Sequence, residues 1–301
     1  MPDPEGGFDL EAGLPCVWKR LGKYVSRTRL KNGRKIHVND SKLVYSPGTG
    51  LKELERSILA LLTTLRGWNE QLADVLAVAA PNCIGDLPGY PWYDARYSEA
   101  FPLEADGTSA RLFAKALAEH MDHTSTRLVH LEAKIVCERQ LNQMFDATRN
   151  KGNALFSIAA QHIDYLLRTY GRQNLVITCD RQGARGYYGP LLRLMFDEWS
   201  LEVVREHEGF SDYRLRQGDH VVRLVFCEKA EAQCLPVAAA SMLSKYLREA
   251  LMRRFNAYWQ SLLPDLAPTA GYYGDGSRFL QDIDEKRREL NVPDDLLIRS
   301  R

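Results

Sequence analysis

Residues 174–180 read Asn-Leu-Val-Ile-Thr-Cys-Asp, a short run rich in β-branched residues that ends in an acid. Such a run predicts a buried strand of an α/β sheet, with Asp180 at its carboxyl end. In open α/β sheets, ligands bind at the carboxyl ends of the strands. This stretch therefore predicts an α/β fold and a candidate functional carboxylate.

The surrounding sequence extends this prediction. A helical pattern over 154–170 precedes the strand, and Gly171 is typical of a helix end. Further strand-like runs follow at 201–205, 213–216 and 221–227, and the turn Gln217-Gly218-Asp219 joins the last two as a hairpin. Pro236 opens a long helix that runs to about residue 262. Helices that alternate with strands and one hairpin predict a mixed sheet flanked by helices.

The rest of the chain is mainly helical. Apolar residues at helical spacing predict helices over 51–65, 109–123 and 280–290, and residues 128–136 fit either a strand or a helix. Residues 81–102 predict a long loop that carries a group of aromatic side chains: Tyr90, Trp92, Tyr93, Tyr97 and Phe101. Long loops in compact domains are often functional, but these rings also fit a plug over the edge of the core or a partner interface.

Composition excludes several classes of protein. The 301 residues include 40 Lys and Arg against 39 Asp and Glu, so the chain is not basic throughout, although a local basic groove remains compatible with this balance. No apolar run is long enough for a membrane span, and the first residues resemble no signal peptide. Six cysteines without a CxxC pair indicate reduced thiols. We expect a monomeric cytoplasmic protein with no membrane partner.

Two segments could bind charged ligands. In Asn39-Asp40-Ser41-Lys42, a lysine beside a hydroxyl and turn amides can hold a phosphate, although a solvated turn has the same composition. Asp180 is followed by Arg181, by a second arginine and by two glycines, which suits a site for a charged ligand. Asp180 could equally cap the next helix.

Two further segments lie near the carboxyl end of the chain. Ser241, Lys245 and Glu249 follow one another at intervals of four, so they share one face of the predicted helix. A surface pair of lysine and glutamate would give the same spacing. In residues 268–279, paired tyrosines framed by glycines suit stacking on a sugar or base, or a turn packed on the core.

In this order and spacing, the four segments resemble ribonuclease HII, which cuts the RNA strand of RNA–DNA hybrids. Asn39-Asp40-Ser41-Lys42 resembles the family's Asp-Ser-Lys motif. Asp180 resembles the metal-binding Asp of its Val-Asp-Gly motif, with Arg181 in place of the glycine.

The same resemblance continues downstream. Residues 239–249 resemble the family's Ala-Ala-Ser-Ile-x-Ala-Lys-x-x-Arg-Asp motif, with Glu249 in place of the final Asp. Gly271-Tyr272 is similar to its Lys-Gly-Tyr-Gly-Thr segment. The resemblance covers about residues 36–65 and 131–283.

The resemblance implies a ribonuclease H-like fold and a metal-dependent endonuclease that acts on RNA–DNA hybrids or on ribonucleotides embedded in DNA. Asp180 and Glu249 would be the catalytic, metal-binding carboxylates for Mg²⁺ or Mn²⁺, ions that prefer oxygen ligands. Tyr272 would contact the ribose. The residues that would bind phosphates of the nucleic acid are Ser41, Lys42, Arg181, Ser241 and Lys245.

The domain organisation expected from this resemblance is a single ribonuclease H-like domain over residues 1–301. It would contain a helical and aromatic insertion at 66–128 and end in a helical extension at 264–301.

One departure from the family concerns its first strand, which carries an adjacent Asp-Glu pair in an Asp-Glu-Ala-Gly-x-Gly-Pro motif. The nearest counterpart has Asp9 and Glu11 separated by one residue, which changes the sides of a strand that they face. We expect that this strand either precedes Met1 or has been lost. Its loss would leave a catalytically impaired module that binds hybrids, and a protein that binds partners through its aromatic loop is a third hypothesis.

Overall fold

The computed structural model of the chain describes residues 16–30, 33–94, 100–183 and 185–299. These residues form two compact units. We call Gln140–Ala238 the sheet unit, and residues 16–139 with Ala239–Arg299 the helical unit. The boundaries between them fall inside two helices, α6 (Glu138–Thr148) and α10 (Leu235–Leu262). Asp9, Glu11 and Tyr97 lie outside the described residues.

The sheet unit follows the predicted alternation closely. In chain order its complete elements are α7 (Lys151–Tyr170), β3 (Val176–Asp180), α8 (Gly189–Met195), β4 (Ser200–His207), β5 (Phe210–Gln217), β6 (His220–Cys227) and α9 (Ala230–Gln233). The strands form one sheet of order β3-β6-β5-β4, in which β3 is parallel to β6 and the other pairs are antiparallel. The prediction of an α/β chain with a mixed sheet flanked by helices is confirmed.

Turn chemistry fixes the register of this sheet. Gln217 pairs with His220, and the two residues between them form the predicted tight turn, where Gly218 has a φ of +57°. Glycine adopts this left-handed conformation without steric cost. At the other side, β4 is the edge strand, and its register with β5 shifts between Val203 and Arg205, so that Val204 forms a bulge.

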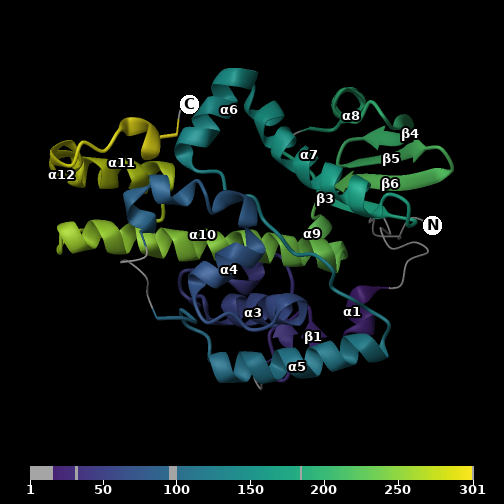
Figure 1. Cartoon of the computed structure of the whole chain (residues 1–301), viewed down its shortest axis with the longest axis horizontal. Helices are drawn as coiled ribbons and strands as arrows, with labels where there is room; N and C mark the ends of the chain where they lie inside the picture. Colours follow the sequence, from purple (N-terminus) through teal and green to yellow (C-terminus); the bar gives the residue numbers. More distant parts are fainter. Residues whose placement is uncertain (1–15, 31–32, 95–99, 184, 300–301) are drawn as a thin grey trace. The chain divides into compact units, whose positions relative to one another are not determined.

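The core of the sheet unit lies on the face that α7 and α8 cover (Figure 1). Side chains alternate between the two faces of each strand, so residues 222, 224 and 226 of β6 pack against these helices. Residues 225 and 227 face the other way and pack with Ala230 of α9. The sheet therefore has helices on both faces.

The helical unit contains one two-stranded parallel sheet, β1 (Val25–Ser26) with β2 (Ile36–His37). Its α-helices are α1 (Val17–Arg20), α2 (Ser41–Val44), α3 (Lys52–Arg66), α4 (Leu72–Ala79), α5 (Gly107–His123), most of α10, α11 (Tyr273–Asp282) and α12 (Asp284–Glu289). The helices predicted over 51–65 and 109–123 are thus confirmed as α3 and α5, which run side by side (Figure 1).

One buried carboxylate connects three parts of the helical unit: α3, residues 103–105 and α10. Glu55 of α3 is 0% exposed. Its Oε1 accepts hydrogen bonds from the Leu103 amide at 2.8 Å and the Tyr246 hydroxyl at 2.9 Å, and its Oε2 accepts from the Glu104 and Ala105 amides, each at 2.7 Å. Burial raises the pKa of Glu55, and these donors oppose that shift.

The aromatic segment packs onto the core. It contains the 3₁₀ turns η1 (Pro81–Cys83), η2 (Leu87–Gly89) and η3 (Pro91–Tyr93). Trp92 is almost fully buried, and its ring lies 5.2 Å from that of Phe255 and 6.4 Å from that of Trp259 on α10. Trp92 and its neighbour Tyr90 therefore act as a plug over the core.

Two predicted elements differ in the structure. Residues 128–136 form neither strand nor helix, although the Ala133 amide donates to the Ala79 carbonyl at 2.7 Å. The single helix predicted over 280–290 is divided at Ile283, where α11 ends and α12 begins. Ile283 is fully buried, so packing fixes the break.

Two general findings concern membranes and thiols. Within the described ranges, no helix combines the length and the apolar character that a membrane span requires. All six cysteines are free thiols.

Candidate nucleic-acid interface

The predicted phosphate-binding turn lies against α10 of the helical unit. Asp40 caps α2 by accepting the Lys42 amide at 2.9 Å. Ser41 is buried beside this cap, and its Oγ accepts a hydrogen bond at 3.0 Å from the Oγ of Ser241 on α10. The Lys42 side chain is exposed. Two segments that are 200 residues apart in the chain therefore meet through their serines.

Glu249 lies one turn beyond Lys245 on the same helix and is surrounded by donors. Its carboxylate accepts from Lys245 Nζ at 2.9 Å, from Arg248 Nη1 at 2.6 Å and from the Tyr45 hydroxyl at 2.8 Å. Burial alone would raise the pKa of Glu249, but these three hydrogen bonds outweigh it, and the pKa lies below its ordinary value. Burial and the bond to Glu249 raise the pKa of Tyr45 to about 12. Glu249 is therefore ionised and Tyr45 neutral at physiological pH.

The predicted ribose contact joins the same cluster. Tyr272 is 62% exposed, and the Arg248 guanidinium lies 5.0 Å from the centre of its ring, within the range of a cation–π contact. Arg248 also donates to the Ala270 carbonyl, and Lys245 lies 4.8 Å from the ring of Tyr45. We call Ser41, Lys42, Tyr45, Ser241, Lys245, Arg248, Glu249 and Tyr272 the α10 cluster.

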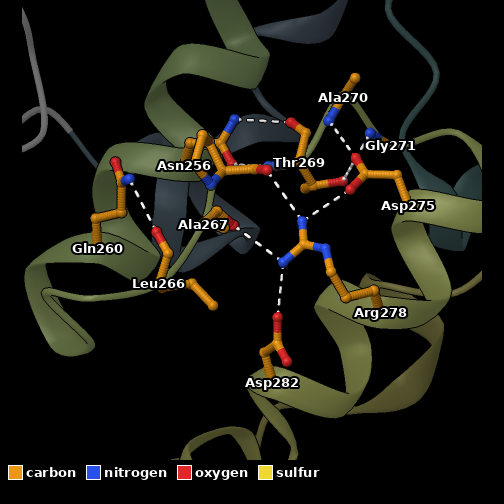
Figure 2. Close-up of polar contacts among 11 residues, drawn as sticks. Asn256, Gln260, Leu266, Ala267, Thr269, Ala270, Gly271, Asp275, Arg278 and Asp282 are labelled. Atoms are coloured by element: carbon orange, nitrogen blue, oxygen red, sulfur yellow. Dashed lines mark hydrogen bonds and ion pairs between the residues drawn. The ribbon is translucent and has the colours of Figure 1, made fainter.

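Figure 2 shows the network that fixes the backbone before Tyr272. Asn256 of α10 donates to the Thr269 carbonyl at 2.9 Å and accepts the Thr269 amide at 2.8 Å. Asp275 of α11 accepts from the Thr269 hydroxyl at 2.6 Å and from the Ala270 amide at 2.7 Å. Arg278 binds Asp275 at 2.7 Å. This segment is thus bonded to α10 on one side and to α11 on the other.

We expect Asp275→Asn to loosen this network and to lower the melting temperature at neutral pH. Hydrogen bonds from Thr269, Arg278 and the Ala270 amide lower the pKa of Asp275 from 3.8 to about 2. Because this pKa is depressed in the folded state, the carboxylate stabilises the fold above pH 4, and this contribution disappears as the pH falls towards 2. Thermal melts of both proteins should differ most at pH 7 and converge in acid. A pH-independent difference would contradict this assignment.

Asp180 and Arg181 are held in the sheet unit by local contacts. Asp180 is the last residue of β3, and its Oδ1 accepts the amide of Ala230, the first residue of α9, at 3.1 Å. Arg181 forms an ion pair with Glu228 at 2.7 Å and donates to the Gly183 carbonyl at 3.0 Å. The Asp180 carboxylate is exposed, whereas the charge of Arg181 is balanced within the unit.

The fit to a divalent metal ion can be tested on each unit. Across the described parts of the chain, no three His, Cys, Asp or Glu side chains are grouped as metal ligands. Glu249 is already neutralised by Lys245 and Arg248, and the Asp180 carboxylate accepts the Ala230 amide. The residues of neither unit alone fit Mg²⁺ or Mn²⁺. Since Asp180 and Glu249 belong to different units, their shared ion stays a prediction.

The sequence predicted one site made of eight residues. The helical unit brings six of them together, namely Ser41, Lys42, Ser241, Lys245, Glu249 and Tyr272, whereas Asp180 and Arg181 belong to the sheet unit. Sequence reasoning overlooked Tyr45 and assigned no role to Arg248. The position of Arg248 beside Glu249 was the available signal, but its contact with Tyr272 depends on the path of residues 269–272.

Comparison of the chain with protein-family models, with curated proteins and with solved structures finds no significant match.

Proposed function

We propose that the chain is a ribonuclease HII-like protein with a ribonuclease H-like fold, and that its α10 cluster binds the backbone of RNA–DNA hybrids. The observation that carries the proposal is the convergence of Ser41, Ser241, Lys245 and Tyr272, which come from three separate segments, in one part of the helical unit. Those segments are the ones that resemble the nucleic-acid-binding motifs of the family.

The chemistry of the cluster supports backbone binding. Lys245, Arg248 and Glu249 together carry one net positive charge, and exposed Lys42 adds a second. Cations of this kind neutralise phosphates and release counterions. The exposed ring of Tyr272 can pack on a sugar, where the 2′-hydroxyl distinguishes RNA from DNA.

We expect Lys42→Glu to weaken binding of a fluorescent RNA–DNA hybrid by about tenfold at low salt, because a phosphate contact is replaced by repulsion. The slope of log affinity against log salt should fall by about 1. Fluorescence anisotropy at several salt concentrations measures both. Lys115→Glu is the matched control, because Lys115 is an exposed lysine of α5 outside the cluster. Equal loss in both variants, or no binding by the unmodified chain, would reject the proposal.

Hydrolysis is a second candidate function, favoured by the exposed carboxylate of Asp180 at the carboxyl end of β3. In this proposal, the chain cleaves the RNA strand of a hybrid, or DNA at embedded ribonucleotides, with Mg²⁺ or Mn²⁺ as cofactor.

We expect Asp180→Asn to reduce such cleavage to background while hybrid binding persists. A labelled hybrid incubated with Mn²⁺ or Mg²⁺ and resolved on a denaturing gel measures the products. If the unmodified chain binds the hybrid but does not cleave it, its function is that of a catalytically impaired module that binds hybrids.

A further inference from the structure

A cavity of about 490 Å³ opens in the sheet unit, and its lining includes neither Asp180 nor Arg181. Its walls come from the first turns of α7, with Gly152 and Leu155, and from the loop after β3, with Gln182, Arg185 and Tyr187. This volume lies in the range of small-ligand sites. The proposed function uses none of these five residues.

Arg185 supplies a cation to the wall of the cavity. Arg185 Nη2 donates to the Asn153 side chain at 2.9 Å, and no carboxylate pairs with Arg185 among the residues that the structure describes. A Cβ at position 152 would lie only 3.0 Å from Nη2, so Gly152 leaves the room that the guanidinium occupies. The guanidinium thus lies at the positive, amino-terminal end of the 20-residue helix α7, and its remaining N–H groups can donate to an anion.

Gln182 also lines the cavity. Its backbone amide donates to the Tyr188 hydroxyl at 3.0 Å. Its Oε1 is buried and has no hydrogen-bond partner among the described residues, and an atom without accessible surface is not in contact with a ligand in the cavity.

The rim of the cavity is apolar and aromatic. Tyr187 is 64% exposed and Leu155 is 50% exposed, although both line the cavity. An exposed tyrosine ring beside an aliphatic side chain offers a flat surface on which a planar heterocycle can stack.

We infer that this cavity binds a single nucleotide with an unpaired base. The phosphate lies on Arg185, and the base stacks on Tyr187. Such a nucleotide comes either from the free pool or from an unpaired end of a nucleic-acid strand. The second source would deepen the proposed function and rests on it, whereas the first does not.

Isothermal titration of the full chain with AMP, adenosine, inorganic phosphate and a 5′-phosphorylated single-stranded DNA pentamer tests the inference. AMP should bind more tightly than adenosine or phosphate, because only AMP engages both ends of the cavity. Tighter binding of the pentamer than of AMP would identify a strand end as the source, and the reverse order would identify the free nucleotide.

Arg185→Ala should weaken AMP binding by about tenfold, and Arg185→Lys should retain part of it, because lysine keeps the charge but loses the planar fork. Tyr187→Ala should weaken it by about fivefold or more. Arg172→Ala removes an exposed arginine of the same unit and should change nothing. Thermal melts confirm that each variant is folded. The inference is overturned if neither AMP nor the pentamer binds, or if Arg185→Ala binds AMP as tightly as the unmodified chain does. Hybrid binding that depends on Lys42 is measured separately, so its failure can be distinguished from a failure of this inference.

Discussion

Glu55→Ala should lower the free energy of unfolding of the helical unit by about 3–5 kcal/mol, the cost typical of removing one partner from a buried charged network. Three backbone amides and the hydroxyl of Tyr246 lose their acceptor, and each unsatisfied buried donor costs about 1–3 kcal/mol. Urea unfolding followed by circular dichroism measures the change, with the midpoint shifted and the slope retained.

Two further substitutions sharpen this test. Glu55→Gln keeps the shape of the side chain but replaces one carboxylate oxygen, which accepts two hydrogen bonds, by an NH2 group that can only donate. The stability of this variant should therefore lie between that of Glu55→Ala and that of the unmodified chain. Glu119→Ala, on the exposed face of α5, should have almost no effect. If Glu55→Ala unfolds at the same urea concentration as Glu119→Ala, the carboxylate does not hold the segment 103–105.

Tyr188→Ala should be the most damaging change in the sheet unit, with a loss of about 3–5 kcal/mol. The Tyr188 ring is 0% exposed and stacks on Phe226 with centroids 3.7 Å apart and planes 7° apart. Its removal leaves a cavity between the helices and the sheet. Urea unfolding followed by tryptophan fluorescence, to which Trp199 in the same core contributes, measures the loss.

Tyr188→Phe separates packing from hydrogen bonding. It keeps the stacked ring and removes only the acceptor of the Gln182 amide, so a loss of about 1–2 kcal/mol is expected. Equal losses in the alanine and phenylalanine variants would show that the stacked ring contributes little to stability.

The sheet unit was largely predictable because its signals are local. Residues 174–180 carry the β-branched pattern of β3, and the Gln217-Gly218-Asp219 turn specifies the hairpin by its own conformational preferences. Residues 128–136 lack such a signal: Leu131 is buried, but no strand among the described residues pairs with this segment. The break at Ile283 is likewise set by packing, which spacing does not encode.

The candidate site was predictable only in part. The pairing of Lys245 with Glu249 follows from their spacing on one helix. The contact of Ser41 with Ser241 depends on how distant segments pack, and only the order of the motifs suggested it. The sequence analysis assigned phosphate binding to Arg181 and gave Arg185 no role, because only the fold shows that Glu228 neutralises Arg181.

The bulge at Val204 affects the tendency of the protein to aggregate at high concentration. Val203 and Val204 are 40% and 42% exposed on the edge strand, a composition that in a flat strand would invite another chain to add itself to the sheet. The extra residue twists β4 and interrupts its row of amides and carbonyls, so an incoming strand finds no continuous register. Solutions of the chain should therefore resist the growth of cross-β aggregates from this edge.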